Sequence, residues 1–255
     1  MTEQTARGFR DRLLAGETLI GTWVKTPALA IVEVLALSGL DVACLDAEHA
    51  PFDRRDLDAC LFAGRQTGLP LVVRVADAAP ATILNALDLG AAGVLVPHVT
   101  DADTAQAVAR ACRFGPGGRG YAGSSRAAGY TTRTMRAYLA DSSSETTVIA
   151  QIEDKEALDA IDDIAAVEGI DALFIGRMDL AVSMGVEDPA APPVIAAMER
   201  ICDAATRHGR RLGMFLANAD EMPRWQALGV SLFLIGSDQG FVLNGARALA
   251  RAKGA

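Results

Sequence analysis

The chain has 255 residues, 51% of them hydrophobic, and a formal net charge of −8 at pH 7. This length and apolar content suit one closed barrel with a large core, so we expect a single domain over residues 1–255. Nucleic acid and anionic lipid bind through basic surfaces, and the acidic balance therefore disfavours both as partners. We therefore expect a small-molecule substrate.

The sequence contains no recognisable targeting or membrane segment. Residues 1–19 mix charged and polar side chains without the apolar stretch of a signal peptide, and no apolar run approaches a length of about 20 residues. We therefore expect a soluble cytoplasmic protein. The widely spaced cysteines form no Cys-x-x-Cys pair and predict buried free thiols: Cys44, Cys60, Cys112 and Cys202.

Short β-branched runs alternate with longer amphipathic stretches along the chain. The eight predicted strands are Leu19–Val24, Val42–Asp46, Leu71–Val75, Gly93–Pro97, Thr147–Ile152, Ala172–Ile175, Leu212–Leu216 and Leu232–Ile235. The predicted helices are Ala28–Ser38, Arg55–Thr67, Ala81–Leu89, Asp103–Cys112, Lys155–Val167, Pro193–His208, Ala219–Leu228 and Phe241–Lys253. This repeated alternation predicts an α/β fold, a (β/α)8 TIM barrel. Gly39, Gly90 and Gly229 stand where helix C-caps need a left-handed residue.

Residues 113–144 interrupt this alternation with a glycine-rich stretch followed by a short helical piece. A loop this long is usually functional, and we expect it at the catalytic end of the barrel. Its glycines and Arg119 admit a phosphate cradle, but no Gly-Lys-Ser/Thr follows and the run does not open a helix. A lid or a subunit contact is the favoured interpretation.

Charged residues follow several predicted strands, at the barrel end where active sites form. Glu153 and Asp179 come after two successive apolar strands, and two carboxylates so placed suit a hard divalent cation. Both could instead be ordinary acids at helix N-termini. The block Asp46-Ala47-Glu48-His49 is harder to explain structurally, because three ionisable groups directly after a buried strand are costly.

Arg74 and Asp88 carry both functional and structural interpretations, whereas two histidines carry only a structural one. Arg74 ends a strand, where it could neutralise those acids or bind a substrate carboxylate or enolate oxygen. Asp88 lies late in a helix, where a carboxylate opposes the helix dipole, which hints at a partner. His98, after a strand, and His208, at a helix end, read as ordinary histidines.

A set of motifs in a fixed order carries a family resemblance. They are Gly21-Thr22-Trp23, Asp46-Ala47-Glu48-His49, Arg74, Asn85-Ala86-Leu87-Asp88-Leu89-Gly90-Ala91-Ala92-Gly93, Gly118-Arg119-Gly120, Gln151-Ile152-Glu153 and Ile175-Gly176-x-x-Asp179-Leu180. The chain thereby resembles the class II pyruvate aldolases of the 4-hydroxy-2-oxoheptanedioate and 2-keto-3-deoxy-sugar-acid family, from Gly21 to about Asp238. The resemblance departs at Arg177-Met178, where the family usually has proline after the glycine.

The resemblance implies a barrel of the phosphoenolpyruvate/pyruvate type and assigns roles to individual residues. A Mg, Mn or Co type ion would lie on Glu153 and Asp179, with Gln151 beside it. Arg74 would bind the keto-acid oxygen, and His49 would act as the base, oriented by Asp88. The substrate pocket would include Asp46, Gly176 and backbone N–H groups near Met178 and Asp179. Apart from the resemblance, three strand residues could form an apolar wall of the pocket or could equally belong to the core: Trp23, Phe215 and Leu216.

The chemistry of these residues fits a metal-dependent aldolase that joins a pyruvate or hydroxypyruvate enolate to an aldehyde. The ion would stabilise the enolate, Arg74 would add a second positive charge, and His49 would move the proton of the 4-hydroxyl. No lysine lies among these strand ends to form an imine, and the nearest is Lys25, just past the first predicted strand. An imine route is therefore disfavoured. Two alternatives remain, a decarboxylase or phosphoenolpyruvate mutase on the same barrel and a non-catalytic keto-acid-binding barrel.

The last predicted helix, Phe241–Lys253, is apolar on more than one face, which exceeds what packing on one barrel requires. A subunit contact would use this excess. The resemblance implies a homohexamer, a trimer of dimers, in which such helices pack across subunits. In that assembly the long loop of residues 113–144 could complete a neighbour's active site.

Overall fold

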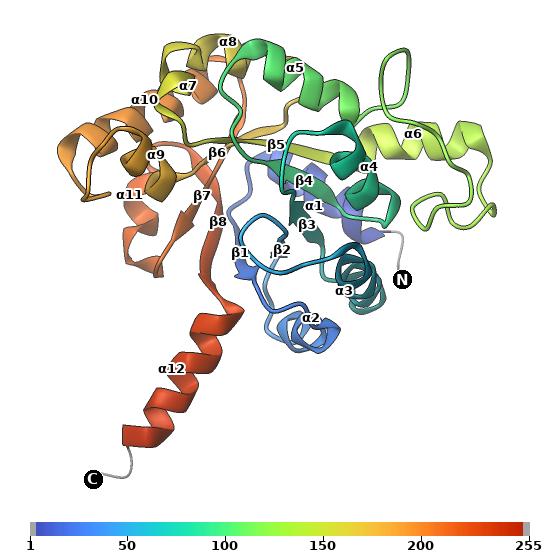
Figure 1. The fold of residues 1–255 in the computed structure, drawn as a ribbon, viewed down its shortest axis with the longest axis horizontal. Coiled ribbons are helices and arrows are strands. Elements are labelled where there is room, and N and C mark those ends of the chain that lie inside the picture. The colour runs from blue at the N-terminus through green and yellow to red at the C-terminus, as the bar shows by residue number, and fades with distance from the viewer. Residues whose placement is uncertain (1–3, 252–255) are drawn as a thin grey trace.

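A computed structural model describes residues 4–251 and contains a closed barrel of eight parallel strands in chain order (Figure 1). The strands are β1 (Leu19–Val24), β2 (Val42–Asp46), β3 (Leu71–Arg74), β4 (Gly93–Val96), β5 (Thr147–Ile152), β6 (Ala172–Ile175), β7 (Arg211–Leu216) and β8 (Val230–Ser237). The predicted (β/α)8 barrel is confirmed, and the predicted strands agree with these to within two residues at each end.

Helices precede, connect and follow the strands. They are α1 (Gln4–Ala15), α2 (Leu29–Ala36), α3 (Arg54–Thr67), α4 (Pro80–Asp88), α5 (Ala102–Ala111), α6 (Met135–Glu145), α7 (Lys155–Asp159), α8 (Ile161–Ala166), α9 (Arg177–Ser183), α10 (Pro192–Arg207), α11 (Met222–Gln226) and α12 (Asp238–Arg251), with a 3-10 turn η1 (Ala219–Glu221). The predicted helix over residues 155–167 is divided at Ala160. Ala252 and Lys253, which end the last predicted helix, lie outside the described residues.

Hydrophobic side chains form one layer inside the barrel and another between strands and helices. The inner layer includes Trp23 and Phe174, whose rings meet edge to face at 6.1 Å. Phe9 and Leu13, one helical turn apart on α1, join this layer beside Leu19. Because α1 also bonds through Arg10 to Asp171, just before β6, it closes the amino end of the barrel. The carboxyl ends of the strands remain for chemistry.

The glycine-rich loop lies at the amino end of the barrel, so its predicted position at the catalytic end is wrong. Helix α5 returns the chain to the amino end before the loop begins. There Arg119 donates to the carboxylate of Asp88 at 2.6 Å and to the hydroxyl of Tyr138 at 2.9 Å. A Cβ atom on Gly118 would collide with the carbonyl oxygen of Arg113. These contacts make Arg119 and this glycine structural, and they give no support to a phosphate cradle.

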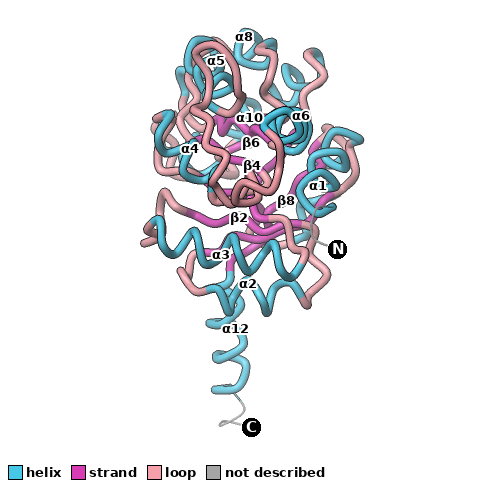
Figure 2. Tube along the Cα trace, turned by 90° about the vertical axis from the view of Figure 1, so that its right-hand side faces the viewer, coloured by secondary structure: helices cyan, strands magenta, loops and turns pink. Residues whose placement is uncertain are grey.

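Other details of the chain follow the sequence closely. Gly39, Gly90 and Gly229 adopt φ angles of 82°, 95° and 91°, as helix C-caps require. All four cysteines are buried and free. Among residues 4–251, no helix has both the length and the apolar character that crossing a membrane would require. Helix α12 extends away from the barrel in both views (Figures 1 and 2), and its apolar side chains Phe241, Val242, Leu243 and Leu249 are exposed.

Candidate active site

Charged side chains gather at the carboxyl ends of β2, β3 and β5. Asp46 ends β2 and lies in register with Arg74, the last residue of β3. Glu48 follows β2 by two residues, and Glu153 directly follows β5. Since parallel strands end at the same rim, the barrel itself brings these groups together. The predicted gathering of acids and an arginine at one rim is therefore present within a single chain.

Arg74 is the cation at the centre of this rim. Its Nε and Nη2 atoms lie 3.0 and 2.8 Å from Oδ1 of Asp46, and its Nη1 lies 3.2 Å from Oε2 of Glu48. The guanidinium also sits over the ring of Trp23, 4.4 Å from its centroid. Two carboxylates and an aromatic face thus fix the plane of the Arg74 guanidinium. A lysine ammonium has no such plane and could not make the same set of contacts.

Asp46 is fully buried and surrounded by donors. Its side chain accepts the backbone N–H of His49 at 3.1 Å, and its Oδ2 lies 3.1 Å from the ammonium of Lys25. Burial acts to raise the pKa of Asp46, but Arg74, the His49 N–H and Lys25 outweigh it and hold the pKa below its ordinary value. Asp46 is therefore a charged anchor for Arg74 and Lys25.

Glu153 is a buried carboxylate at the rim whose hydrogen-bond donors are uncharged. It is 2% exposed, and it accepts the side-chain amide of Gln151 and, at 3.1 Å, the backbone N–H of His98. Burial raises its pKa, although these two hydrogen bonds oppose the effect and Glu48 adds to it. The Oε1 atom of Gln151 is buried without a hydrogen-bond partner. A buried carboxylate beside an unused oxygen acceptor is an environment that favours a bound cation.

Gly176 leaves the space that Glu153 occupies. A Cβ atom on Gly176 would lie 2.6 Å from the Cβ of Glu153 and 2.7 Å from its Oε2. Real Cβ atoms do not approach so closely, so a larger residue would displace the carboxylate. The glycine of the Ile-Gly-x-x-Asp-Leu motif is thus required by the packing of Glu153.

His98 also lies at this rim, although the sequence interpretation gave it no functional role. Its backbone has φ of 54°, a left-handed conformation that is uncommon outside glycine. Its Nδ1 lies 3.0 Å from Asp154 and its Nε2 lies 3.6 Å from Glu48. Burial acts to lower its pKa, but Asp154, Glu153 and Glu48 outweigh it and raise the pKa. A signal was present, because Pro97-His98 directly follows a strand, as Glu153 does.

Glu48, His98 and Glu153 form a group that could hold a metal ion. Each offers one donor atom, and these atoms lie within 4.8 Å of one another. Two carboxylates and an imidazole are an ordinary donor set for divalent first-row metals.

The other predicted site residues occupy different places. His49 is exposed, with Nε2 3.5 Å from Glu48. Met178 and Asp179 are exposed in the first turn of α9. The Arg177 side chain, at the departure from the family pattern, bonds to Glu221 and to the carbonyl of Pro189. Phe215 packs against the layer inside the barrel, whereas Leu216 is buried in the layer between the barrel and the helices.

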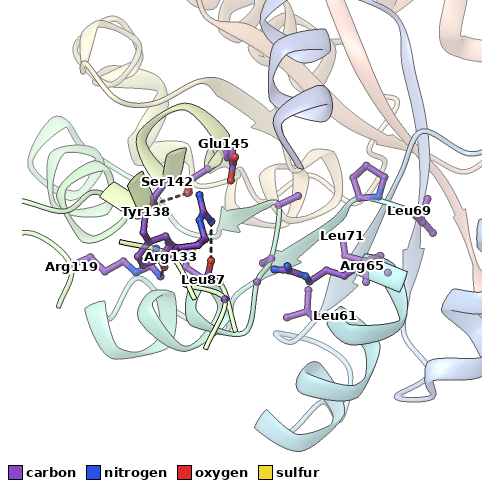
Figure 3. A pocket seen from close by; sticks show the side chains of 18 of the residues that line it. Leu61, Arg65, Leu69, Leu71, Leu87, Arg119, Arg133, Tyr138, Ser142 and Glu145 are labelled. Carbon is purple, nitrogen blue, oxygen red and sulfur yellow. Dashed lines mark hydrogen bonds between the residues drawn. The ribbon is translucent and has the colours of Figure 1, made fainter. Parts of the chain in front are cut away.

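A cavity of about 620 Å³ lies at the amino end of the barrel (Figure 3). It is lined by residues that precede β3, β4 and β5, such as Leu69, and by Arg119, Arg133 and Tyr138 from the loop and α6. Arg119 is paired with Asp88, and Arg133 with Asp141. Arg119 and Arg133 therefore already have carboxylate partners within the chain.

Comparison with known proteins identifies the family. The family model HpcH/HpaI aldolase/citrate lyase matches residues 19–245, which is most of the chain. The chain belongs to this family. A 2-keto-3-deoxy-L-rhamnonate aldolase of Shigella sonnei is 36% identical over 234 residues, covering 90% of this chain and 86% of that protein. An Escherichia coli protein of the same name is 35% identical with the same coverage.

Two solved structures share the fold closely. A family member from Burkholderia cenocepacia superposes with a TM-score of 0.92 at 33% identity, covering 98% of this chain and all of that one. The citrate synthase SbnG superposes with a TM-score of 0.85 at 29% identity, covering 96% of this chain and 98% of its own. The resemblance drawn from the sequence motifs is thus confirmed. As an HpcH/HpaI aldolase the protein is an enzyme, a carbon–carbon lyase.

Proposed function

We propose that the protein is a metal-dependent aldolase that makes or cleaves the bond between a pyruvate or hydroxypyruvate enolate and an aldehyde, acting on 4-hydroxy-2-oxo acids. The observation that carries this proposal is the rim cluster, in which Arg74 is fixed by Asp46 and Glu48 while buried Glu153 lacks a full countercharge. Relatives named as keto-deoxy-sugar-acid aldolases support the substrate class. A cytoplasmic location stays a prediction from the sequence.

Glu153 and Asp179 would hold the divalent ion, which we propose to be Mg, Mn or Co. The fit rests on the buried Glu153 carboxylate and the unpartnered Oε1 of Gln151 beside it. When bound, such an ion supplies Lewis-acid polarisation of the keto oxygen. Gln151, which donates its amide to Glu153, orients that carboxylate. Gly176 and the N–H groups near Met178 would accommodate the substrate carboxylate.

Arg74 would donate to the keto oxygen as it gains negative charge. Its guanidinium is already oriented by Asp46, Glu48 and the ring of Trp23, so little reorganisation is needed during the reaction. A preorganised donor of this kind contributes about 10²–10³ in rate. Asp46 thus acts through Arg74, and Trp23 forms the apolar floor beneath it.

His49 would hold or release the proton of the 4-hydroxyl group. It is exposed at the rim beside Glu48, where a substrate can reach it. An imidazole is suited to this role near neutral pH. Lys25 is a poor candidate for imine chemistry, because its ammonium is held 3.1 Å from the buried Asp46.

Asp88 could orient His49 only from a second copy of the chain. It ends α4 on the amino side of β4, whereas His49 follows β2 on the carboxyl side. The four residues of β4 alone span roughly 13 Å. A pairing of these two groups, which the resemblance implies, therefore needs an active site shared between subunits.

The exposed apolar face of α12 supports an assembled form, for which we propose a homohexamer, a trimer of dimers. Phe241, Val242, Leu243 and Leu249 are between 47% and 78% exposed, which is costly in an isolated chain. Light scattering should give a mass about six times the 26.7 kDa of one chain. A mass equal to one chain would contradict both the assembly and the shared site.

Mixing two inactive variants tests the shared site. If His49 and Asp88 act across subunits, co-expressed His49→Ala and Asp88→Ala chains should regain part of the activity that each lacks alone. Mixing either variant with itself is the matched control. Mixed oligomers as inactive as their parents would remove the cross-subunit pair.

The reaction itself is tested by product identification. The purified protein should be incubated with pyruvate or hydroxypyruvate, a panel of aldehydes and Mg, Mn or Co. We expect a 4-hydroxy-2-oxo acid that forms with an ion and not with a chelator. Release of carbon dioxide without aldehyde consumption would favour the decarboxylase alternative, for which His49 is dispensable.

A further inference from the structure

Three features distinguish His98 from an ordinary surface histidine. Its backbone is held at φ of 54°, a strained conformation for a residue with a Cβ atom. Its N–H donates to the buried Glu153. Its ring lies between Asp154 and Glu48, although 60% of the side chain is exposed. The left-handed turn after β4 thus aims the imidazole at the carboxylate cluster.

The position of Asp154 determines which ring nitrogen of His98 is available to bind a metal ion. Asp154 is the N-cap residue of α7, yet its side chain makes no capping hydrogen bond. Its Oδ2 instead lies 3.0 Å from Nδ1 of His98. An Nδ1–H held by a carboxylate leaves Nε2 with its lone pair, the arrangement found behind metal-bound histidines. That Nε2 faces Oε1 of Glu48 at 3.6 Å.

We infer that His98 is a nitrogen ligand of the divalent ion proposed at Glu153 and Asp179, that Glu48 adds a further carboxylate, and that Asp154 orients the His98 ring. This inference rests on the proposed function, because it concerns the same ion at Glu153. Donor atoms of Glu48, His98 and Glu153 lie within 4.8 Å of one another. The buried and unpartnered Oε1 of Gln151 is an independent sign that the cluster has a missing partner.

A nitrogen ligand has a consequence for metal choice. Imidazole suits first-row transition metals, whereas Mg²⁺ prefers oxygen donors and keeps its waters. The site should therefore bind Co²⁺ or Mn²⁺ more tightly than Mg²⁺. Replacing His98 by glutamine should narrow that difference, and Asp154→Asn should weaken Mn²⁺ binding about tenfold, as loss of an orienting carboxylate does.

Pulsed electron paramagnetic resonance of the protein loaded with Mn²⁺ alone tests the inference directly. A nitrogen ligand adds ¹⁴N modulation to the Mn²⁺ signal. The chain has three histidines, so single replacements assign the nitrogen. We expect modulation in the wild type, in His49→Gln and in His208→Gln, and its loss in His98→Gln. His208 is the matched control, since it is paired with Asp162 beside Arg207.

The outcomes separate this inference from the proposed function. Mn²⁺ bound through oxygen atoms only, or modulation that persists in His98→Gln, would overturn the role of His98 and leave the aldolase proposal standing. A wild-type protein that binds no Mn²⁺ would overturn the role of His98, and one that binds none of Mn²⁺, Co²⁺ and Mg²⁺ would overturn the metal-dependent aldolase as well. Calorimetry measures Mn²⁺ binding to the same variants. It therefore distinguishes a variant that has lost only the nitrogen ligand from one that no longer binds the ion.

Discussion

The two ends of the barrel differ in how their buried carboxylates are paired with cations. At the amino end, Arg10 binds both oxygens of Asp171 at 3.0 and 2.7 Å, and Asp171 also accepts the N–H of Val148. At the carboxyl end, Arg74 serves both Asp46 and Glu48, and Glu153 is left with an amide, a backbone N–H and His98. Carboxylates are matched by arginines at one end and outnumber cations at the other.

This difference separates structure from function. A hydrogen-bonded pair of opposite charges, such as Arg10 with Asp171, stabilises the fold and does not need a ligand to neutralise it. An excess of carboxylate around a buried group costs stability unless a cation or substrate arrives. The following substitutions disrupt charged contacts or packing at one end of the barrel or the other. At the carboxyl end we expect loss of activity, and at the amino end we expect loss of stability.

The largest effect is expected for Glu153→Gln. Loss of the proposed ligand should lower kcat/KM by about 10³-fold or more, since the ion supplies several kcal/mol to the transition state. Because burial raises the pKa of Glu153, its charged form costs stability at neutral pH, and the neutral amide removes that cost. Melting of the chelated variant should therefore occur at the same or a higher temperature than wild type. A much lower Tm would make Glu153 a structural residue.

Arg74→Lys should lower kcat by about 10²–10³. An ammonium cannot reproduce the fork that contacts Asp46 and Glu48 and lies over Trp23. Arg10→Lys is the matched control at the amino end, where a bidentate pair is also lost but kcat should not change. Steady-state kinetics of both variants decide the matter, and an unchanged kcat for Arg74→Lys would remove this residue from the mechanism.

Gly176→Ala should lower kcat/KM by about tenfold to 10²-fold, the cost of a misplacement near 1 Å. The added Cβ would stand 2.6 Å from that of Glu153 and push the carboxylate aside. Mn²⁺ affinity measured by calorimetry should fall in parallel. Gly8→Ala is the control, because its Cβ meets nothing within 4 Å in helix α1. Equal activity of both variants would contradict the packing argument.

Asp171→Asn should leave the activity of the folded protein unchanged and destabilise it by about 3 kcal/mol, as breaking one side of a buried pair does. Denaturant unfolding measures this loss. Asp162, an exposed acid that pairs with Arg207, provides a control whose change to asparagine should cost less than about 1 kcal/mol. A loss of kcat with unchanged stability for Asp171→Asn would mean that the amino end also serves catalysis.

The barrel and its rim were predictable because they rest on repeated local patterns. Strands and helices alternate visibly, and Arg74 and Glu153 stand out as charges after apolar strands. The position of the glycine-rich loop was also within reach, since the predicted helix before it returns the chain to the amino end. Phe9 and Leu13, one turn apart, could likewise have indicated α1.

His98 and the surroundings of Asp88 depend on tertiary structure and could not be predicted in the same way. His98 follows a strand in the sequence, but the position of its imidazole beside Glu48 and Glu153 depends on a left-handed turn and on Asp154, 56 residues away. Asp88 was suspected of having a partner, but the identity of that partner, Arg119, required the folded loop.

Proton exchange at C3 of pyruvate is the most direct test of the central claim, that the uncompensated rim holds an ion to form an enolate. In deuterated water, ¹H NMR follows the loss of the methyl signal and needs no aldehyde partner. We predict exchange with the wild type and Mg²⁺, and none after chelation or in Glu153→Gln. Exchange that continues at the same rate without an ion, or in that variant, would contradict the account and point to an imine route through Lys25.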